Sequence, residues 1–165
     1  MPNIGENDYR MGARERLDEA YLLISNKQFS GGIYLAGRAV EGMLRAVIWK
    51  QDPDYAAGRK SLETGHDLRE LVRLIRNLGA LRGVKFGDEI TRGVQRIARL
   101  WSNNMRFLPR SVINRIWYDA GYVGGKRTLK AATQEYFIAC TSIVRQCEAL
   151  WQARSESRSE KSARS

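Results

Sequence analysis

Residues 30–50, SGGIYLAGRAVEGMLRAVIWK, decide the fold class of this chain, because their apolar side chains recur at helical spacing. Ser30 can cap the N-terminus of this helix, since its hydroxyl can accept a hydrogen bond from a free first-turn amide. Glycine costs a helix interior about 1 kcal/mol relative to alanine, so Gly37 and Gly42 indicate close packing of a neighbouring helix. The expected apolar face consists of Ile33, Gly37, Val40, Leu44 and Val47.

Helical periodicity recurs in the rest of the chain, and strand signals are nearly absent. Gly79 is expected to end the third helix, and Pro109 disfavours helix at Leu108 and is expected to end the fourth. Helices joined by short loops predict an all-α fold, an up-and-down antiparallel bundle of four to five helices. Besides 30–50, the expected helices cover residues 9–26, 64–78, 86–107 and 126–152, with a single helical turn at 112–117.

One ordered domain is predicted over residues 9–152, between a flexible N-terminus at 1–8 and a disordered polar tail at 153–165. No apolar run approaches the ~18–20 residues that a membrane helix needs, and the first residues do not resemble a signal peptide. Cys140 and Cys147 lie seven residues apart on one expected helix, too far apart to bridge each other. One histidine, His66, and two cysteines leave few ligands for a zinc site. From these features together we expect a cytoplasmic protein without a metal, a cofactor or a membrane contact.

The net charge of +10 is concentrated in the middle of the chain. Residues 67–130 hold fourteen basic and five acidic side chains, whereas residues 1–66 hold nine of each. Arginine, which outnumbers lysine 21 to 7, is the residue best suited to bidentate phosphate contacts. Such a segment predicts an anionic partner, most commonly nucleic acid, and the alternative is a solvated basic surface.

Five polar side chains of the expected fourth helix are spaced by +4, +3, +4 and +3 residues, which would align them on one stripe opposite its apolar face. Neighbouring guanidinium groups repel one another unless an anion or a carboxylate lies between them. We therefore expect the stripe to contact the phosphates of a nucleic acid, the alternative being an exposed helix face. The candidate nucleic-acid-binding residues are Arg92, Arg96, Arg99, Asn103 and Arg106.

Residues 120–128, AGYVGGKRT, resemble a phosphate-binding P-loop only in part. Ala120 stands where the first glycine is needed, and Arg127 stands where serine or threonine should follow the lysine. What remains is a glycine pair before a basic helix start, where free amides and two cations could hold a phosphate; the alternative is a flexible loop. The phosphate-binding candidates are Gly125, Lys126, Arg127 and Thr128.

Three motifs give the chain a resemblance to the HEPN family (higher eukaryotes and prokaryotes nucleotide-binding). They are GGIYLAGRAVEGMLRA at 31–46, preceded by ARERLDEAYLL at 13–23; TGHDLREL at 64–71; and LWSNNMRF at 100–107, which is similar to the family's Trp, four residues, Arg-aromatic signature. The resemblance covers residues 9–152 and implies a bundle of four or five helices that often dimerises.

Many HEPN proteins are metal-independent ribonucleases of toxin–antitoxin pairs, phage defence and RNA-guided effectors. The family motif, an arginine followed by a histidine after four to six residues, implies Arg106 as the arginine, with Asn103 as its polar neighbour. The histidine should fall at 111–113, where the chain has Ser-Val-Ile, so it has no obvious general acid or base for attack by a 2′-hydroxyl. Arg59 and His66 have suitable spacing, but they span a loop and a helix start, and we interpret the match as chance.

The favoured hypothesis is a homodimeric HEPN-like protein that binds RNA or a nucleotide in a toxin–antitoxin or phage-defence system and lacks the ribonuclease dyad. A second hypothesis is a degenerate metal-independent endoribonuclease in which Arg106 stabilises the pentavalent phosphate. A third is a protein-interaction module whose basic face binds an acidic partner such as a nucleotidyltransferase. The first hypothesis places the two Arg106 side chains near the dimer axis.

Overall fold

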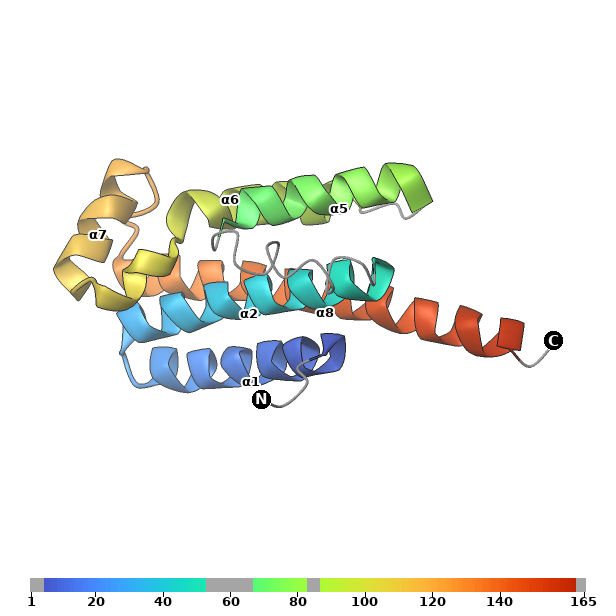
Figure 1. Ribbon diagram of the computed structural model, residues 1–165. Helices are drawn as coiled ribbons and strands as arrows, with labels where there is room; N and C mark the ends of the chain where they lie inside the picture. The colour runs from blue at the N-terminus through green and yellow to red at the C-terminus, as the bar shows by residue number, and fades with distance from the viewer. Residues whose placement is uncertain (1–4, 53–66, 83–86, 163–165) are drawn as a thin grey trace.

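The computed structural model describes residues 5–52, 67–82 and 87–162 (Figure 1). Its described part consists of helices and their connections, with one isolated β-bridge between Gly124 and Arg127 and no β-strand. The all-α helical bundle predicted from the sequence is therefore confirmed. The elements are α1 (Glu6–Ser25), α2 (Phe29–Gln51), α5 (Leu68–Arg82), α6 (Asp88–Leu100), the short 3-10 helix η1 (Asn103–Phe107), α7 (Arg110–Asp119) and α8 (Leu129–Ser162).

Helix α2, the segment from which the fold class was predicted, is the centre of the bundle. Of its 23 residues, 15 are buried, and it packs against α1, α5 and α8. Figure 1 shows α2 between α1 on one side and α5 on the other. Small residues allow the close approach to α1: a Cβ at Gly32 would lie 2.4 Å from Ile24, and one at Gly42 would lie 3.4 Å from Ala13.

Contacts between neighbouring helices show in which direction each helix runs. Helix α1 is antiparallel to α2, and also to α8, since Tyr21 packs on Phe137 and Arg10 pairs with Glu148. Helices α5 and α6 are antiparallel to each other, as are α6 and α8 (Figure 1). As a result α2, α5 and α8 run in one direction, and α1 and α6 run in the other.

The prediction of one helix over 86–107 is wrong beyond Leu100, where α6 ends. Trp101 has extended backbone angles (φ −125°, ψ 138°), and a separate 3-10 helix follows. The indole of Trp101 lies where Gly37 of α2 lacks a side chain, because a Cβ at Gly37 would be 2.2 Å from the ring. Its Nε1 donates a hydrogen bond to the carbonyl oxygen of Tyr34 (3.1 Å). Packing of this one ring against α2 therefore ends α6.

Other helix boundaries also differ from the sequence expectation. Helix α5 continues through Gly79 to Arg82, and α7 is a full helix of ten residues rather than one turn. The buried Trp117 anchors α7 by donating its Nε1 hydrogen to the carbonyl oxygen of Leu100 (3.0 Å).

The expected boundaries at both ends of the domain also require correction. Helix α1 begins at Glu6, inside the expected flexible N-terminus 1–8. Helix α8 continues to Ser162, into the expected disordered tail 153–165. Extending a helix that already exists needs no new nucleation, and the charged residues beyond 152 are good helix formers. The expected loop and helix start at 53–66, with Arg59 and His66, lie outside the described residues.

Within the described ranges, no helix combines the length and the apolar character needed to cross a membrane. Nor do three or more His, Cys, Asp or Glu side chains gather there into a group that could hold a metal ion. Cys140 and Cys147 are both free thiols in the core.

Candidate nucleic-acid interface

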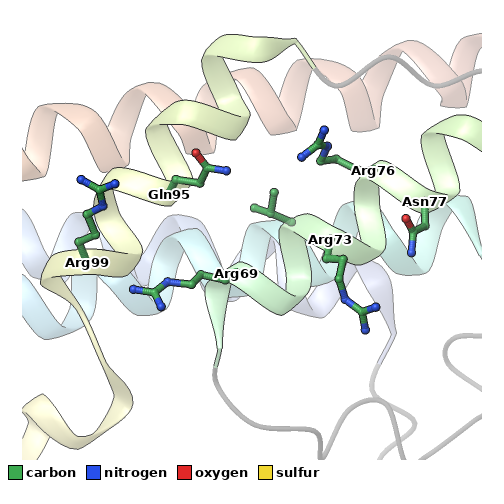
Figure 2. A pocket seen from close by; sticks show the side chains of 7 residues that line it. Arg69, Arg73, Arg76, Asn77, Gln95 and Arg99 are labelled. Atoms are coloured by element: carbon green, nitrogen blue, oxygen red, sulfur yellow. The ribbon is translucent and has the colours of Figure 1, made fainter.

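A groove of about 780 Å³ lies between α5 and α6, and its lining is rich in arginine (Figure 2). Val72 is the apolar residue of the lining. Figure 2 shows the Arg76 side chain of α5 extending toward α6, and Arg69 and Arg99 at the same end of the groove. The polar lining residues are Arg69, Arg73, Arg76 and Asn77 from α5, and Gln95 and Arg99 from α6.

The amphipathic pattern of α5 explains why three of its arginines face the groove. Arg69, Arg73 and Arg76 are spaced by +4 and +3 residues, so they share one face of the helix and are exposed. The carboxylate of Asp67 accepts a hydrogen bond from the backbone N–H of Arg69 (2.9 Å) and so satisfies a donor at the start of the helix. The buried residues of the opposite face are Leu68, Leu71 and Ile75, and the buried Val72 lies at the edge of the groove.

The antiparallel arrangement of α5 and α6 places a pair of arginines at each end of this face. Arg69 and Arg99 line one end of the groove. At the other end, Arg76 and Arg92 line an adjoining pocket of about 440 Å³ together with Asp88 and Thr91. Seven residues separate the two pairs on each helix, which corresponds to roughly 10 Å at 1.5 Å per residue. We call the two pairs and the groove between them the arginine groove.

The arginine groove has an excess of positive charge. Arg73 is paired with Glu70, whose carboxylate accepts from the Arg73 Nε at 2.9 Å. That hydrogen bonding lowers the pKa of Glu70 and raises the pKa of Arg73. Within the described part of the chain, no carboxylate forms an ion pair with Arg69, Arg76 or Arg99. The groove therefore suits an anionic ligand with more than one charge.

The arginines predicted on α6 are all exposed, but they do not act as one stripe. Arg99 faces the groove, whereas the Nε of Arg96 donates to the hydroxyl of Tyr122 (2.7 Å), in the connection between α7 and α8. The Arg96 guanidinium also lies over the Tyr122 ring, 5.3 Å from its centroid. Arg92 donates to the backbone oxygen of Asp88 (3.3 Å) and borders the second pocket.

Asn103 and Arg106 do not continue that stripe, because the helix ends at Leu100 and both residues belong to η1. The amide oxygen of Asn103 accepts a hydrogen bond from the hydroxyl of Tyr34 (3.4 Å). Arg106 is exposed, and its guanidinium lies 4.5 Å from the ring centroid of Phe107. The prediction of a single five-residue stripe is therefore wrong: three of its members lie on α6 and two on η1.

The phosphate-binding candidates before α8 form a tight turn closed by the Gly124–Arg127 bridge, with Gly125 at φ +59°. Arg127 is engaged by Glu135, and its guanidinium lies over the Tyr122 ring. The hydroxyl of Thr128 accepts from the backbone N–H of Ala131 (3.2 Å) and caps α8. Gly125, Lys126 and Thr128 are exposed, whereas Arg127 is half-buried.

The arginines of α5 are not among the site residues predicted from the sequence. Their +4, +3 spacing is the same signal that singled out α6, and it was available in the sequence. What the spacing could not indicate is that α5 and α6 pack side by side with these faces adjacent (Figure 2).

No family model, no curated protein and no solved structure matches this chain. The resemblance to the HEPN family stays a hypothesis that rests on the quoted motifs. Of the positions where the family histidine is expected, Ser111, Val112 and Ile113, all three lie in the first turn of α7, and Ile113 is buried in the core.

Proposed function

We propose that this protein is a HEPN-like RNA-binding protein that holds the phosphate backbone in the arginine groove. The observation that carries the proposal is the convergence of Arg69, Arg76 and Arg99 from two helices on one groove without a carboxylate partner among the described residues. Guanidinium groups bind phosphate oxygens in bidentate geometry, and a concave site keeps those donors converging on one ligand.

The length of the arginine groove favours a polymer over a mononucleotide. Its two arginine pairs are roughly 10 Å apart along the helices. A stacked strand places about three phosphates in that length, at ~3.4 Å per phosphate along its axis. Arg69 with Arg99 and Arg76 with Arg92 would then contact different phosphates of one strand.

The salt dependence of RNA binding tests this proposal. The roughly three phosphates that fit in the groove predict a slope of about −2 for log Kobs against log salt on a single strand, since each neutralised phosphate contributes about −0.7. Exchanging two groove arginines for glutamate, as Arg69→Glu/Arg99→Glu, should weaken binding of a ten-nucleotide RNA about 100-fold at moderate salt and lower the slope by about half. Both side chains are exposed, so the variant should fold normally.

A matched control makes the same change in net charge at two sites outside the groove. Lys27→Glu/Arg145→Glu alters two exposed cations on the α1–α2 turn and on α8. If this variant weakens RNA binding as much as the groove variant, the effect is one of total charge and the groove has no special role.

Two alternative functions are outcomes of the same experiment. An RNA affinity that is low and insensitive to the groove variant would favour the third hypothesis, an acidic protein partner such as a nucleotidyltransferase. Cleavage of the RNA in the presence of a metal chelator, abolished by Arg106→Ala, would favour the degenerate endoribonuclease. A toxin–antitoxin or phage-defence role and the homodimer belong to the same proposal and follow from the family resemblance, and the cytoplasmic location follows from the composition.

A further inference from the structure

Phe107 is unusually accessible for a phenylalanine. Its side chain is 72% exposed at the end of η1, and the guanidinium of Arg106 lies over its ring, 4.5 Å from the centroid. Base rings stack on such aromatic faces, and a neighbouring guanidinium adds a cation–π contact and a positive charge for the phosphate.

The position of Phe107 is set by the fold rather than by its own packing. On the inner side of η1, Met105 is buried, and Asn103 is hydrogen-bonded to Tyr34 of α2. Before η1, the Trp101 indole packs where Gly37 has no side chain, and after η1, Pro109 directly precedes α7. Because the chain is anchored on both sides of η1, the backbone that carries the ring has little conformational freedom. Less entropy is therefore lost when a base stacks on the ring.

The surroundings of Phe107 favour a base over a protein surface as the group that covers it. Its exposed neighbours along the chain are polar, cationic or proline: Asn104, Arg106, Pro109 and Arg110. A protein interface needs a contiguous apolar core within a buried area of about 1,000 Å² or more, which one ring among cations does not supply. A single aromatic face is sufficient to stack one base.

We infer that Phe107, flanked by Arg106, stacks a base of single-stranded RNA whose backbone lies in the arginine groove. This inference rests on the proposed function and adds a residue that binds a base. In a duplex the bases are paired and stacked on each other, so only an unpaired strand can offer a base face to Phe107.

The chain geometry places Phe107 within reach of the same strand. Arg99, at the end of the groove, precedes Phe107 by eight residues, of which the last five form η1. Four steps of at most ~3.6 Å up to Asn103 and four of ~2.0 Å within η1 keep the two Cα atoms within about 22 Å of each other. A strand of about six stacked nucleotides covers that distance at ~3.4 Å each.

The test compares Phe107→Leu and Phe107→Trp with the unchanged protein. The leucine keeps an apolar side chain of similar size but removes the aromatic face, and the tryptophan keeps the face. Three RNA probes are used: a ten-nucleotide single strand, the same strand annealed to its complement, and a three-nucleotide strand that fills the groove alone. Light scattering and thermal unfolding of each variant exclude effects on assembly and folding.

We expect Phe107→Leu to bind the ten-nucleotide single strand about 10-fold more weakly, because one base loses its stacking partner. Its affinity for the duplex and for the three-nucleotide strand should not change, and neither should its salt slope, since Phe107 contacts no phosphate. Phe107→Trp should bind all three probes at least as tightly as the unchanged protein.

Three results would overturn the inference: equal binding of the long strand by Phe107→Leu, an equal loss on all three probes, or dissociation of a dimer by Phe107→Leu. The last would identify Phe107 as a contact between copies of the chain. Failure of the proposed function is separate, because the unchanged protein would then bind none of the probes with the expected salt slope.

Discussion

Replacing Gly37 with alanine tests whether Trp101 is the residue that ends α6. An alanine Cβ at this position would lie 2.2 Å from both Cδ1 and Nε1 of the indole, well inside van der Waals contact. The ring is rigid, so it must move, and it would then lose the hydrogen bond that its Nε1 donates to the carbonyl oxygen of Tyr34.

The size of the effect follows from three contributions to the free energy of unfolding. Overpacking in a dense core costs about 1–3 kcal/mol. Loss of one hydrogen bond costs about 1 kcal/mol. Alanine in place of glycine stabilises a helix by about 1 kcal/mol, which offsets part of the loss. We expect Gly37→Ala to be destabilised by about 2 kcal/mol, a Tm lower by about 4–8 °C for a chain of this size.

Gly12→Ala is the matched control, because it makes the same chemical change in the interior of α1. An added Cβ at Gly12 meets no atom within 4 Å. Only the gain in helix propensity remains, so this variant should unfold about 2–4 °C above the unchanged protein.

Thermal unfolding followed by far-UV circular dichroism measures both variants under the same conditions. The reasoning predicts opposite signs for one substitution at two sites. If Gly37→Ala melts at or above the temperature of the unchanged protein, the indole does not need the space at Gly37, and another cause must end α6 at Leu100.

Three further predictions concern other parts of the molecule. Burial raises the pKa of the Cys147 thiol to about 12 and raises the pKa of Cys140 as well. An unfolded thiol loses its proton near pH ~8.5, so above that pH the unfolded state binds fewer protons and the free energy of unfolding falls by up to about 1.4 kcal/mol per pH unit per thiol. Urea unfolding between pH 7 and 10 should show this fall, with a smaller slope in Cys147→Ala; a flat profile contradicts it. Deleting residues 154–165, whose one apolar residue is Ala163, should leave the Tm within about 1 °C, and a loss of several degrees would show that this segment packs on the bundle. Light scattering at tens of micromolar should give the mass of a dimer, and a monomer would count against the dimer proposed from the family resemblance.

Periodicity and charge are local properties, and for that reason the sequence predicts them well. Apolar residues at helical spacing in 30–50 were sufficient to predict a helix with one apolar face, whereas the structure buries 15 of the 23 residues of α2. The concentration of arginine in 67–130 is likewise read from the sequence alone, and the arginine groove lies within this segment. Both properties can be read within a few turns of helix, without knowledge of any partner element.

Boundaries that depend on contacts between elements could not be predicted in this way. Pro109 was expected to end the fourth helix, but α6 ends at Leu100, nine residues earlier, because Trp101 fits a gap that a glycine 64 positions before it leaves in another helix. Helix α5 passes through Gly79, where local preference predicts a stop.

In the candidate site, too, some features follow from local sequence and others from contacts between helices. The sequence by itself determined that arginines recur on one face of α6 and, with the same spacing, on one face of α5. Only the tertiary structure decided that these two faces adjoin, that Arg96 turns away to Tyr122, and that η1 carries Phe107 outward. The physical reason is that helical spacing sets which side chains share a face, whereas packing of the opposite, apolar faces into one core decides which faces meet.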